Sequence, residues 1–569
     1  MVGLRKSSKV AFGFKAGRSL LLWKRRRFWG RIDEIKRYSM QYIPNSNIKL
    51  DLNEQFQAAC NLMENTRQNV FITGKAGTGK STILSYFRNH TKKETVVLAP
   101  TGVAAINIQG QTIHSFFKFK PNITLSKVKR LYNNKSGKLN IYEKIDTIII
   151  DEISMVRADL LDCVDKFLRL NGKDIEKPFG GIQMIFIGDL YQLPPVVSGN
   201  EKSIFKGDYN SEYFFDAKIF DKSLFGCSFE MEFLELEKIY RQKDQAFIDI
   251  LNTIRNNTVS ANELEVLNKR FSPNFKHSLD DYYIYLTTTN KMAAGINNDR
   301  LNGVKKQNFT FRGTLSGDFD KKYLPTDIEL NLKVGAQVML LNNDTRERWV
   351  NGSIGIIKDI IDDETDTPSI MVELSTGSTV CVEPYTWTVF HFDYDQKQKS
   401  LVSKTVGSFT QYPIKLAWAI TIHKSQGKTF DKVIIDIRNG TFAHGQMYVA
   451  LSRCTSLDGI VLKKEILKKH ILMDWRVTRF ITKYQYDLAD KKCSLDDKII
   501  IINEAIKNKK TLEIIYLKAK DEKSKRKIKP SFLGELIYLD KKFLGVKAFC
   551  LDRGEDRTFR VDRILEIIL

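Results

Sequence analysis

The chain has 569 residues, of which 42% are hydrophobic and 28% charged, a length that predicts several domains with sizeable cores. Its ordinary Gly and Pro contents exclude fibrous, collagen-like and wholly disordered proteins. Lysine and arginine outnumber the acidic residues by 23, which favours a polyanionic partner, nucleic acid first, over a basic surface that serves only solubility.

Residues 1–48 are predicted to be a disordered basic segment, because residues 1–32 hold ten Lys or Arg and no acidic residue precedes Asp33. A cytoplasmic location is expected, but an Arg-rich, acid-poor start can be an organelle transit peptide, and a targeting segment would place the protein in mitochondria or the nucleus instead. A basic arm or a misplaced translation start are the alternatives. The sequence alone does not separate these hypotheses.

From about Leu50 onward, short β-branched runs alternate with amphipathic stretches, which predicts a parallel sheet with crossover helices. Ligands of such sheets bind at the carboxyl ends of the strands, so the turns after them are where functional residues are expected. The strongest strand candidates are Asn69–Thr73, Thr95–Leu98, Thr147–Ile150, Gln183–Ile187 and Lys432–Ile435.

The run Gly74–Ser81 has the spacing of a phosphate-binding loop, with a strand candidate before it and a helix-like run, Thr82–Arg88, after it. Glycines let backbone N–H groups close around phosphates, and a helix N-terminus adds a favourable dipole. Lys80 would hold the β- and γ-phosphates of ATP, and Ser81 would ligate Mg²⁺. The predicted nucleotide contacts are Gly74, Gly77, Thr78, Gly79, Lys80, Ser81 and Thr82.

Two further strand ends are expected to supply polar side chains to the same nucleotide-binding edge of the sheet. Asp151 would hold Mg²⁺ and Glu152 would act as the general base, although an acidic pair that caps a buried strand is the alternative for these two residues alone. Gln192 lies in the run Gly188–Pro195 and is placed to sense the γ-phosphate. By itself, that run is also a rigid turn.

The run Gly188–Pro195 resembles the nucleotide sensor of superfamily one helicases. Ala99–Ala105 and Thr112–Phe117 resemble the strand-contacting segments of the Pif (petite integration frequency) branch. Small residues, a hydroxyl and an imidazole suit phosphate contacts, and Phe116 or Phe117 offers a stacking face, with a core-packed aromatic pair as the alternative. The contacts implied here are Thr101, Gly102, His114, Ser115 and Phe116.

Later segments continue the resemblance to Pif-type DNA helicases. Leu236–Gln242 and Tyr448–Arg453 are similar to motifs whose arginines, Arg241 and Arg453, reach the γ-phosphate from the second α/β unit and stabilise charge in the transition state. For either arginine alone, a surface ion pair is the alternative. Leu416–Thr429 is the most family-specific stretch. In it, His423, Lys424 and Ser425 are implied DNA contacts, and Gln426 and Gly427 nucleotide contacts.

The resemblance covers roughly Leu52–Ile471, with Asn290 as a further implied nucleic-acid contact. One departure concerns the glutamine that reads adenine in the family, because its spacing is shifted here. Gln55 is the candidate and Gln57 the rival.

The C-terminal runs Phe543–Cys550 and Arg553–Ile564 resemble a WYL domain. WYL domains are associated with nucleic acid or nucleotide-like ligands, which implies an unidentified ligand. The phosphate contacts this implies are Arg553, Arg557, Arg560 and Arg563. The alternative is that these arginines pair with Glu555, Asp556 and Asp562.

The sequence thus predicts an α/β fold with two RecA-like P-loop domains, a small SH3-like β-barrel inserted in the second, and a β-rich WYL-like domain. The first RecA-like domain is expected at 49–225, with a wedge-like insertion at 118–144. The second is expected at 226–475, with the barrel at about 298–410. A linker at 476–493 and the WYL-like domain at 494–569 complete the chain.

The function that this resemblance implies is an ATP-dependent DNA helicase that uses ATP and Mg²⁺. It would move 5′ to 3′ on single-stranded DNA and unwind duplex, fork or structured DNA. A single-stranded-DNA-dependent translocase without strand separation is one alternative, and a WYL-type ligand-sensing regulator with a vestigial motor is another. The seven scattered cysteines predict free thiols in a reducing cytoplasm. No apolar run approaches the roughly 20 residues of a bilayer-spanning helix, so no membrane partner is expected.

Overall fold

The computed structural model describes residues 52–131, 140–197, 205, 208–221, 229–361, 368–438, 440–518, 520–538 and 541–568. The basic segment 1–48 and the middle of the expected wedge, 132–139, lie outside the described residues. The chain divides into two compact units, 1–57 and 58–569. Of the first unit the structure describes 52–57, which include the start of helix α2 (Glu54–Asn65). All further elements belong to the second unit.

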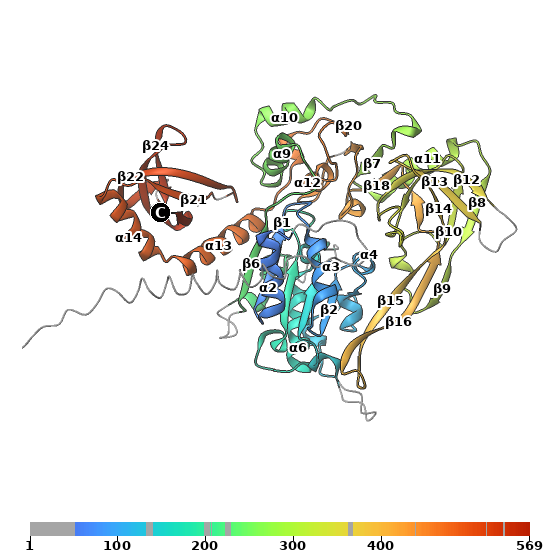
Figure 1. Ribbon diagram of the computed structural model, residues 1–569, viewed down its shortest axis with the longest axis horizontal. Helices are drawn as coiled ribbons and strands as arrows, with labels where there is room; N and C mark the ends of the chain where they lie inside the picture. The colour runs from blue at the N-terminus through green and yellow to red at the C-terminus, as the bar shows by residue number, and fades with distance from the viewer. Residues whose placement is uncertain are drawn as a thin grey trace, which may run out of the picture. The chain divides into compact units, whose positions relative to one another are not determined.

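Six parallel strands, of which β1, β2 and β6 are labelled in Figure 1, form the first sheet in the order β3-β2-β4-β5-β1-β6. They are β1 (Asn69–Gly74), β2 (Thr95–Ala99), β3 (Gln111–Thr112), β4 (Thr147–Ile150), β5 (Gln183–Ile187) and β6 (Met231–Leu236). Four of them confirm the predicted strands. β4 and β5 are buried along their whole length, as befits apolar strands inside a parallel sheet. Because β6 pairs with β1, the first domain extends past the expected boundary at 225.

Helices connect these strands. They are α3 (Lys80–His90), α4 (Gly102–Asn107), α5 (Ile113–Phe116) and α6 (Ala158–Asn171). The predicted helix Thr82–Arg88 is confirmed, and α3 begins two residues earlier, directly after Gly79. α3 buries Ile83, Leu84 and Phe87, so one face of it packs on the sheet.

The second α/β domain has a parallel sheet of order β18-β7-β19-β20. Its strands are β7 (Ile284–Thr287), β18 (Ala419–Thr421), β19 (Val433–Asp436) and β20 (Ile460–Leu462). Its helices are α9 (Gln245–Arg255), α10 (Ala261–Asn268), α11 (Asn290–Gly303) and α12 (Gln446–Leu451). The predicted strand Lys432–Ile435 is confirmed as β19, shifted by one residue.

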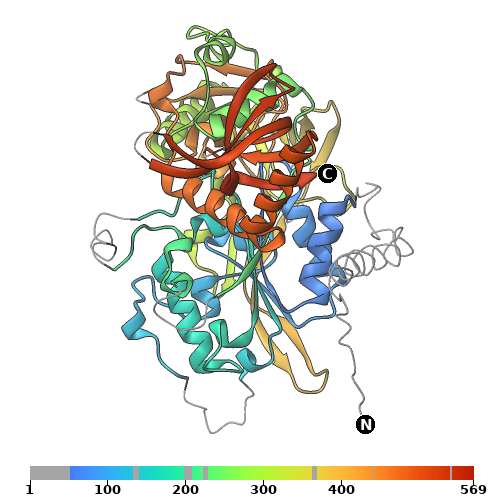
Figure 2. The same ribbon diagram turned by 90° about the vertical axis from the view of Figure 1, so that its left-hand side faces the viewer.

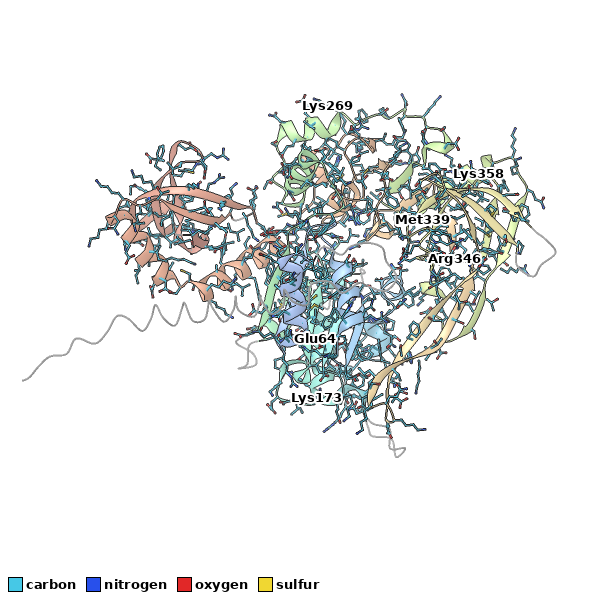
Figure 3. All side chains as sticks on the ribbon, viewed as in Figure 1. Glu64, Lys173, Lys269, Met339, Arg346 and Lys358 are labelled. Atoms are coloured by element: carbon cyan, nitrogen blue, oxygen red, sulfur yellow. The ribbon has the colours of Figure 1, made fainter. Side chains whose placement is uncertain are left out.

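A β-rich insertion separates β7 from β18, as expected. Its strands are β8 (Asn308–Arg312), β9 (Thr314–Gly317), β10 (Glu329–Lys333), β11 (Gln337–Leu340), β12 (Ile354–Ile361), β13 (Ser369–Leu374), β14 (Thr379–Val382), β15 (Tyr385–Asp395), β16 (Ser400–Gln411) and β17 (Ile414–Leu416). They form sheets of five, three and two strands, so the SH3-like barrel is not confirmed. Charged side chains lie on this insertion, such as Lys358, which pairs with Glu373 at 2.6 Å (Figure 3).

The strands β15 and β16 form a long hairpin that the sequence did not predict. It reaches from the insertion to the first α/β domain (Figure 1). The Leu401 backbone N–H donates to the Glu94 carboxylate at 2.6 Å, and the His391 ring nitrogen lies 3.5 Å from Ser115 Oγ. The hairpin therefore joins the insertion to the segment of the first domain that is predicted to contact DNA.

The C-terminal domain follows helix α13 (Trp475–Lys492), which occupies the expected linker. Helix α14 (Leu495–Lys507) packs on a five-stranded antiparallel sheet of order β24-β23-β22-β21-β25 (Figure 2, orange helices and red strands). The strands are β21 (Leu512–Leu517), β22 (Lys523–Tyr538), β23 (Lys541–Cys550), β24 (Glu555–Arg560) and β25 (Ile564–Ile568). Within the described ranges, no helix has the length and apolar character to span a bilayer.

Candidate active site and nucleic-acid interface

Three neighbouring strands of the first sheet carry the residues of the predicted nucleotide site. β1, β5 and β4 run parallel and side by side, so their carboxyl ends meet at one edge of the sheet. Lys80 follows β1, Asp151 and Glu152 follow β4, and Gln192 follows β5. The strand order thus brings together side chains that are distant in the chain, Lys80 and Gln192 being 112 positions apart.

The phosphate-binding loop needs glycine at two positions. Gly77 has a φ of 83°, and a Cβ there would lie 2.5 Å from the Cβ of Arg241. Gly79 has a φ of 88° and caps α3. The Tyr240 backbone N–H donates to the Gly77 carbonyl at 2.9 Å, so the segment that carries Arg241 lies directly on the loop.

Lys80 lies inside this loop. Its Nζ donates to the carbonyl oxygens of Gly74 (2.8 Å) and Lys75 (3.0 Å). Burial lowers the pKa of Lys80, and the carboxylates of Asp189 and Glu152 oppose that shift. A loop closed around one ammonium group suits a triphosphate. Ser81 and Thr82 are exposed at the start of α3, and Thr78 is buried and donates to the Lys75 carbonyl at 2.9 Å.

Asp151, which is buried, and Glu152, which is half-buried, form an acidic pair on the turn after β4. Burial raises the pKa of Asp151 to about 6. Burial and then the neighbouring Asp151 raise the pKa of Glu152 to about 7, while Lys80 opposes the shift. Two adjacent carboxylates whose charged forms burial disfavours, beside a phosphate loop, fit a site that receives a cation, and Asp151 would hold Mg²⁺ there.

A glutamine of the second domain joins this pair to the sensor. Gln426 Nε2 donates to the Glu152 carboxylate at 3.2 Å and to Gln192 Oε1 at 3.3 Å. Gln192 in turn donates to the Asp189 carboxylate at 3.2 Å. The predicted general base and sensor are therefore connected through one residue of the other domain. Gly427, with a φ of 78°, turns the chain just after Gln426.

The two predicted arginines lie at the same interface, but they do not come from the same domain. Arg241 follows β6 of the first sheet, which corrects the expectation that both belong to the second domain. Its guanidinium donates to the Ser452 carbonyl at 3.0 Å. Arg453 is 1% exposed and donates to the Val449 carbonyl at 2.9 Å. Burial, followed by repulsion from Arg241, lowers the pKa of Arg453 to about 9.

Sequence reasoning missed two further groups. The Ala76 N–H of the phosphate loop donates to the Tyr448 hydroxyl at 2.9 Å, which joins α12 to the loop. Arg255 is buried and lies 3.5 Å from Asp189. Tyr448 and Asp189 stand inside motifs that the sequence did show. Arg255 ends an amphipathic helix, where an arginine gives no signal of its own.

The predicted DNA-contacting segments of the first domain are short helical turns. Thr101 caps α4 by accepting a hydrogen bond from the Ala104 N–H at 3.3 Å. Gly102 is buried, and a Cβ there would meet the Tyr323 ring of the insertion at 2.2 Å. His114 and Ser115 lie half-buried on α5. This face is thus covered in part by the insertion.

Phe116 does not offer the expected stacking face. It is 5% exposed and packs edge-on against Phe117, Tyr142 and Phe392, with ring centroids 4.9, 5.5 and 6.1 Å away. The core-packed alternative is therefore correct for both phenylalanines. The reason is tertiary: helix α6 and the long hairpin supply apolar partners that are distant in sequence.

The segment His423–Ser425 forms a single 3-10 turn after β18. The His423 ring stacks on Phe442 with centroids 6.2 Å apart, and Lys424 is exposed. Ser425 is fully buried and its hydroxyl donates to the Ile422 carbonyl at 2.7 Å, so the expected DNA contact by this hydroxyl is not supported. Asn290 is exposed at the first turn of α11.

The two candidate adenine readers lie on α2. Gln55 is half-buried, and Gln57 Nε2 donates to the Leu52 carbonyl at 2.7 Å. The choice of Gln55 stays a prediction.

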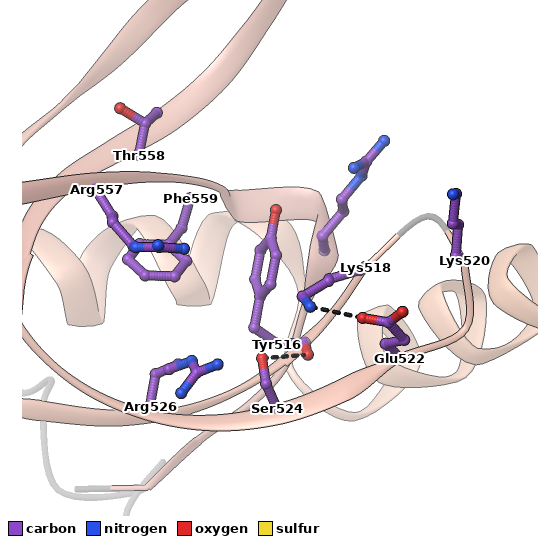
Figure 4. Close-up of a pocket in the computed structure, with 10 residues that line it drawn as sticks. Tyr516, Lys518, Lys520, Glu522, Ser524, Arg526, Arg557, Thr558 and Phe559 are labelled. Carbon is purple, nitrogen blue, oxygen red and sulfur yellow. Dashed lines mark hydrogen bonds and ion pairs between the residues drawn. The ribbon is translucent and has the colours of Figure 1, made fainter. Parts of the chain in front are cut away.

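The C-terminal domain contains a cavity, shown in Figure 4. Its volume is about 450 Å³. Its lining residues are Tyr516, Lys518, Lys520, Glu522, Ser524, Arg526, Arg557, Thr558, Phe559 and Arg563. Arg557 pairs with Glu555, and Arg560 pairs with Asp562 at 2.6 Å, as the ion-pair alternative expected of these two arginines. Arg553 is exposed and, like Arg560, does not line this cavity.

Three family profiles match the chain. They are PIF1-like helicase over residues 51–265, helicase over 336–494 and WYL domain over 497–569. The ATP-dependent DNA helicase Pif1 of Campylobacter jejuni is 31% identical over 413 residues, which cover 68% of this chain and 87% of that protein. The chain belongs to the Pif1 helicase family. A second Pif1 relative, from Bdellovibrio bacteriovorus, is 30% identical over 446 residues, 77% of this chain and 93% of the relative.

Solved Pif1 structures agree with this assignment. A Bacteroides Pif1 in complex with ADP-AlF4 is 38% identical, with a TM-score of 0.69 over 77% of this chain and 98% of that one. The Pif1 helicase of Candida albicans is 29% identical, with a TM-score of 0.58 over 76% of this chain and all of that one. The chain is thus an ATP-dependent DNA helicase with RecA-like domains and a WYL domain, and its cofactors are ATP and Mg²⁺.

Proposed function

We propose that this Pif1 helicase moves along single-stranded DNA from 5′ to 3′ and unwinds duplex or forked DNA ahead of it. Lys80 and the loop N–H groups would bind the triphosphate, and Asp151 with Ser81 would hold Mg²⁺. Glu152 would accept the proton of the attacking water. Arg241 and Arg453 would stabilise the charge that develops on the transferred phosphoryl group.

The observation that carries this proposal is the position of Gln426. It contacts both Glu152 and Gln192, and it directly follows the turn that holds His423 and Lys424. A single rigid turn therefore has one end in the nucleotide site and the other on the candidate DNA surface. A change in the spacing of the two domains alters both ends at once, which is what a motor that couples hydrolysis to strand grip requires.

Turnover of ATP with and without single-stranded DNA tests the coupling. DNA is expected to stimulate the intact protein, and Lys80→Ala is expected to lower kcat at least about 100-fold. Strand displacement on duplexes with a 5′ or a 3′ tail tests the direction, with product expected only from the 5′ tail. DNA-stimulated turnover without displaced strands would favour a translocase that does not unwind DNA. Absence of stimulation by DNA would contradict the proposed motor function.

We further propose that the WYL cavity binds an anionic, phosphate-bearing ligand of the nucleotide or nucleic-acid class. Its lining includes five cationic side chains and one acidic one, Glu522, which pairs with Lys518 at 2.6 Å (Figure 4). Tyr516 and Phe559, with ring centroids 5.2 Å apart, add aromatic surface for a base. Phosphate attraction and stacking are the two terms by which proteins hold single strands and nucleotides.

Photo-crosslinking tests this second proposal. An iodouracil oligonucleotide is expected to crosslink within the WYL domain, and Arg563→Ala, which alters the cavity lining, is expected to lose that crosslink. Arg560→Ala is the matched control, because Arg560 pairs with Asp562 outside the lining. Equal crosslinking by both variants would contradict a ligand site in this cavity.

A further inference from the structure

One turn of the WYL domain reaches the helicase motor. It joins β21 to β22, where Leu517 pairs with Lys523, and the Asp521 N–H closes it by donating to the Lys518 carbonyl at 3.1 Å. Asp521 has a φ of 56°, a left-handed conformation that aspartate tolerates better than most residues. Although it lies at the tip of a hairpin, Asp521 is only 8% exposed.

Asp521 is buried because the motor covers it. Its carboxylate accepts hydrogen bonds from the Tyr191 hydroxyl at 2.9 Å and from Gln485 Nε2 at 3.0 Å. Its carbonyl accepts a hydrogen bond from Asn256 Nδ2 at 3.2 Å. The Arg255 guanidinium lies 3.6 Å from the same carboxylate. Asp521 therefore contacts three parts of the motor: the nucleotide-sensor turn, α9 with its C-terminal cap, and α13.

Arg255 connects this contact to the nucleotide site. Its guanidinium lies 3.8 Å from the centre of the Tyr191 ring and 3.5 Å from the Asp189 carboxylate. Asp189 accepts a hydrogen bond from Gln192, which Gln426 joins to the general base. The contacts form a continuous series: Asp521, Arg255, Asp189, Gln192, Gln426 and Glu152.

Charge supports the same docking. Burial alone lowers the pKa of Arg255, but Asp189, Tyr191, Tyr448 and Asp521 together raise it above its usual value, so the buried arginine stays charged. Beside the tip, Lys523 Nζ lies 2.6 Å from the Glu235 carboxylate on β6. Because β6 pairs with β1, this ion pair lies next to the strand that leads into the phosphate loop.

We propose that Asp521 is a positioning residue for ATP hydrolysis: docked on Arg255 and Tyr191, it fixes the Asp189–Gln192 sensor from the WYL domain. The inference rests on the proposed motor. Without Asp521, the buried guanidinium keeps one carboxylate partner and Tyr191 loses its acceptor, so the sensor turn is less firmly held. Asp521 is not among the residues of the phosphate loop, so the effect falls on turnover more than on nucleotide binding.

Steady-state kinetics test this role. Asp521→Ala is expected to lower the kcat of DNA-stimulated ATP hydrolysis about tenfold and to change the KM for ATP less than about twofold. Asp521→Asn keeps one acceptor oxygen, for Tyr191 or for Gln485 but not for both, and cannot form the ion pair with Arg255. It is expected to fall between Asp521→Ala and wild type. Asp556→Ala is the matched control, because Asp556 is an exposed aspartate of the same domain and does not line the cavity.

Thermal unfolding accompanies each assay. If Asp521→Ala and Asp521→Asn turn over ATP at the wild-type rate, the positioning role is wrong, whatever their stability. If Asp556→Ala loses as much turnover as Asp521→Ala, the loss is not specific to the docked carboxylate, which also overturns the proposal. A wild-type protein that DNA does not stimulate would instead contradict the proposed motor, so the two failures are distinguishable.

Discussion

The nucleotide site and the nucleic-acid surface of this helicase are built differently. At the nucleotide site, polar side chains follow parallel strands and join one buried network, from Glu152 through Gln426 to Gln192. On the nucleic-acid surface, the candidate contacts lie on single helical turns, such as α5 and the turn His423–Ser425. A strand end fixes where the next side chain lies, because the sheet holds the strand on both sides. A single turn takes its orientation from whatever packs against it.

This difference explains why the two regions differ in how many of their predicted residues are accessible. The predicted nucleotide-site residues meet at one edge of the sheet. On the other surface, Phe116 and Ser425 are buried and cannot contact DNA as predicted. Substitutions at the nucleotide site are therefore expected to affect catalysis, and substitutions on the surface are expected to separate into stability effects and binding effects.

The largest effect is expected from Arg453→Lys. Lysine keeps the charge but lacks the planar fork that contacts the Val449 carbonyl and the Ser452 hydroxyl. The kcat for ATP is expected to fall about 1000-fold, with single-stranded DNA affinity unchanged. Arg438→Lys, at an exposed arginine that pairs with Asp436, is the control and should turn over at the wild-type rate. A loss of less than about tenfold in Arg453→Lys would remove this arginine from the catalytic group.

Phe116→Ala is expected to destabilise the first domain by about 3 kcal/mol, because it empties a buried aromatic cluster. Thermal unfolding measures this. Phe442→Ala is the matched comparison: Phe442 is 63% exposed and stacks on His423, so its loss should leave stability unchanged and weaken DNA binding by about 1 kcal/mol. The reverse pattern would show that Phe116, and not Phe442, faces the strand.

Gln426→Ala is expected to reduce DNA-stimulated turnover about tenfold, since it removes both hydrogen bonds that join the general base to the sensor. Turnover without DNA should change less, because the glutamine acts through the contact between the domains. Rates measured with and without DNA decide this. An equal loss in both conditions would assign Gln426 to catalysis alone.

The smallest effect concerns Lys428. Burial lowers the pKa of Lys428 to about 8, so its positive charge is present below pH 8 and lost as the pH rises through that value. If Lys428 contacts phosphate, the salt dependence of DNA binding should become about one unit shallower between pH 7.5 and 9. Lys415, with a pKa lowered to about 7 by burial, is largely neutral over this range. Lys428→Arg stays charged and should show no such change.

The sequence by itself determined the strands β1, β2, β4 and β5, the phosphate loop and the order of the motifs. These features are local: β-branched runs and glycine spacing are properties of a few consecutive residues. The predicted helix after the loop and the β-rich insertion also follow from local pattern. Because parallel strands order their carboxyl ends at one edge, the position of Lys80, Asp151, Glu152 and Gln192 follows as well.

Only the tertiary structure decided that β6 completes the first sheet, that the long hairpin covers α5, and that Phe116 is buried. The same holds for Arg255 and Asp521, which are 266 positions apart in the chain and meet beside the sensor. Neither residue lies in one of the sequence motifs described above. The role of each depends on a partner from another domain. Local pattern carries no information about such pairs, and the packing of whole domains determines them.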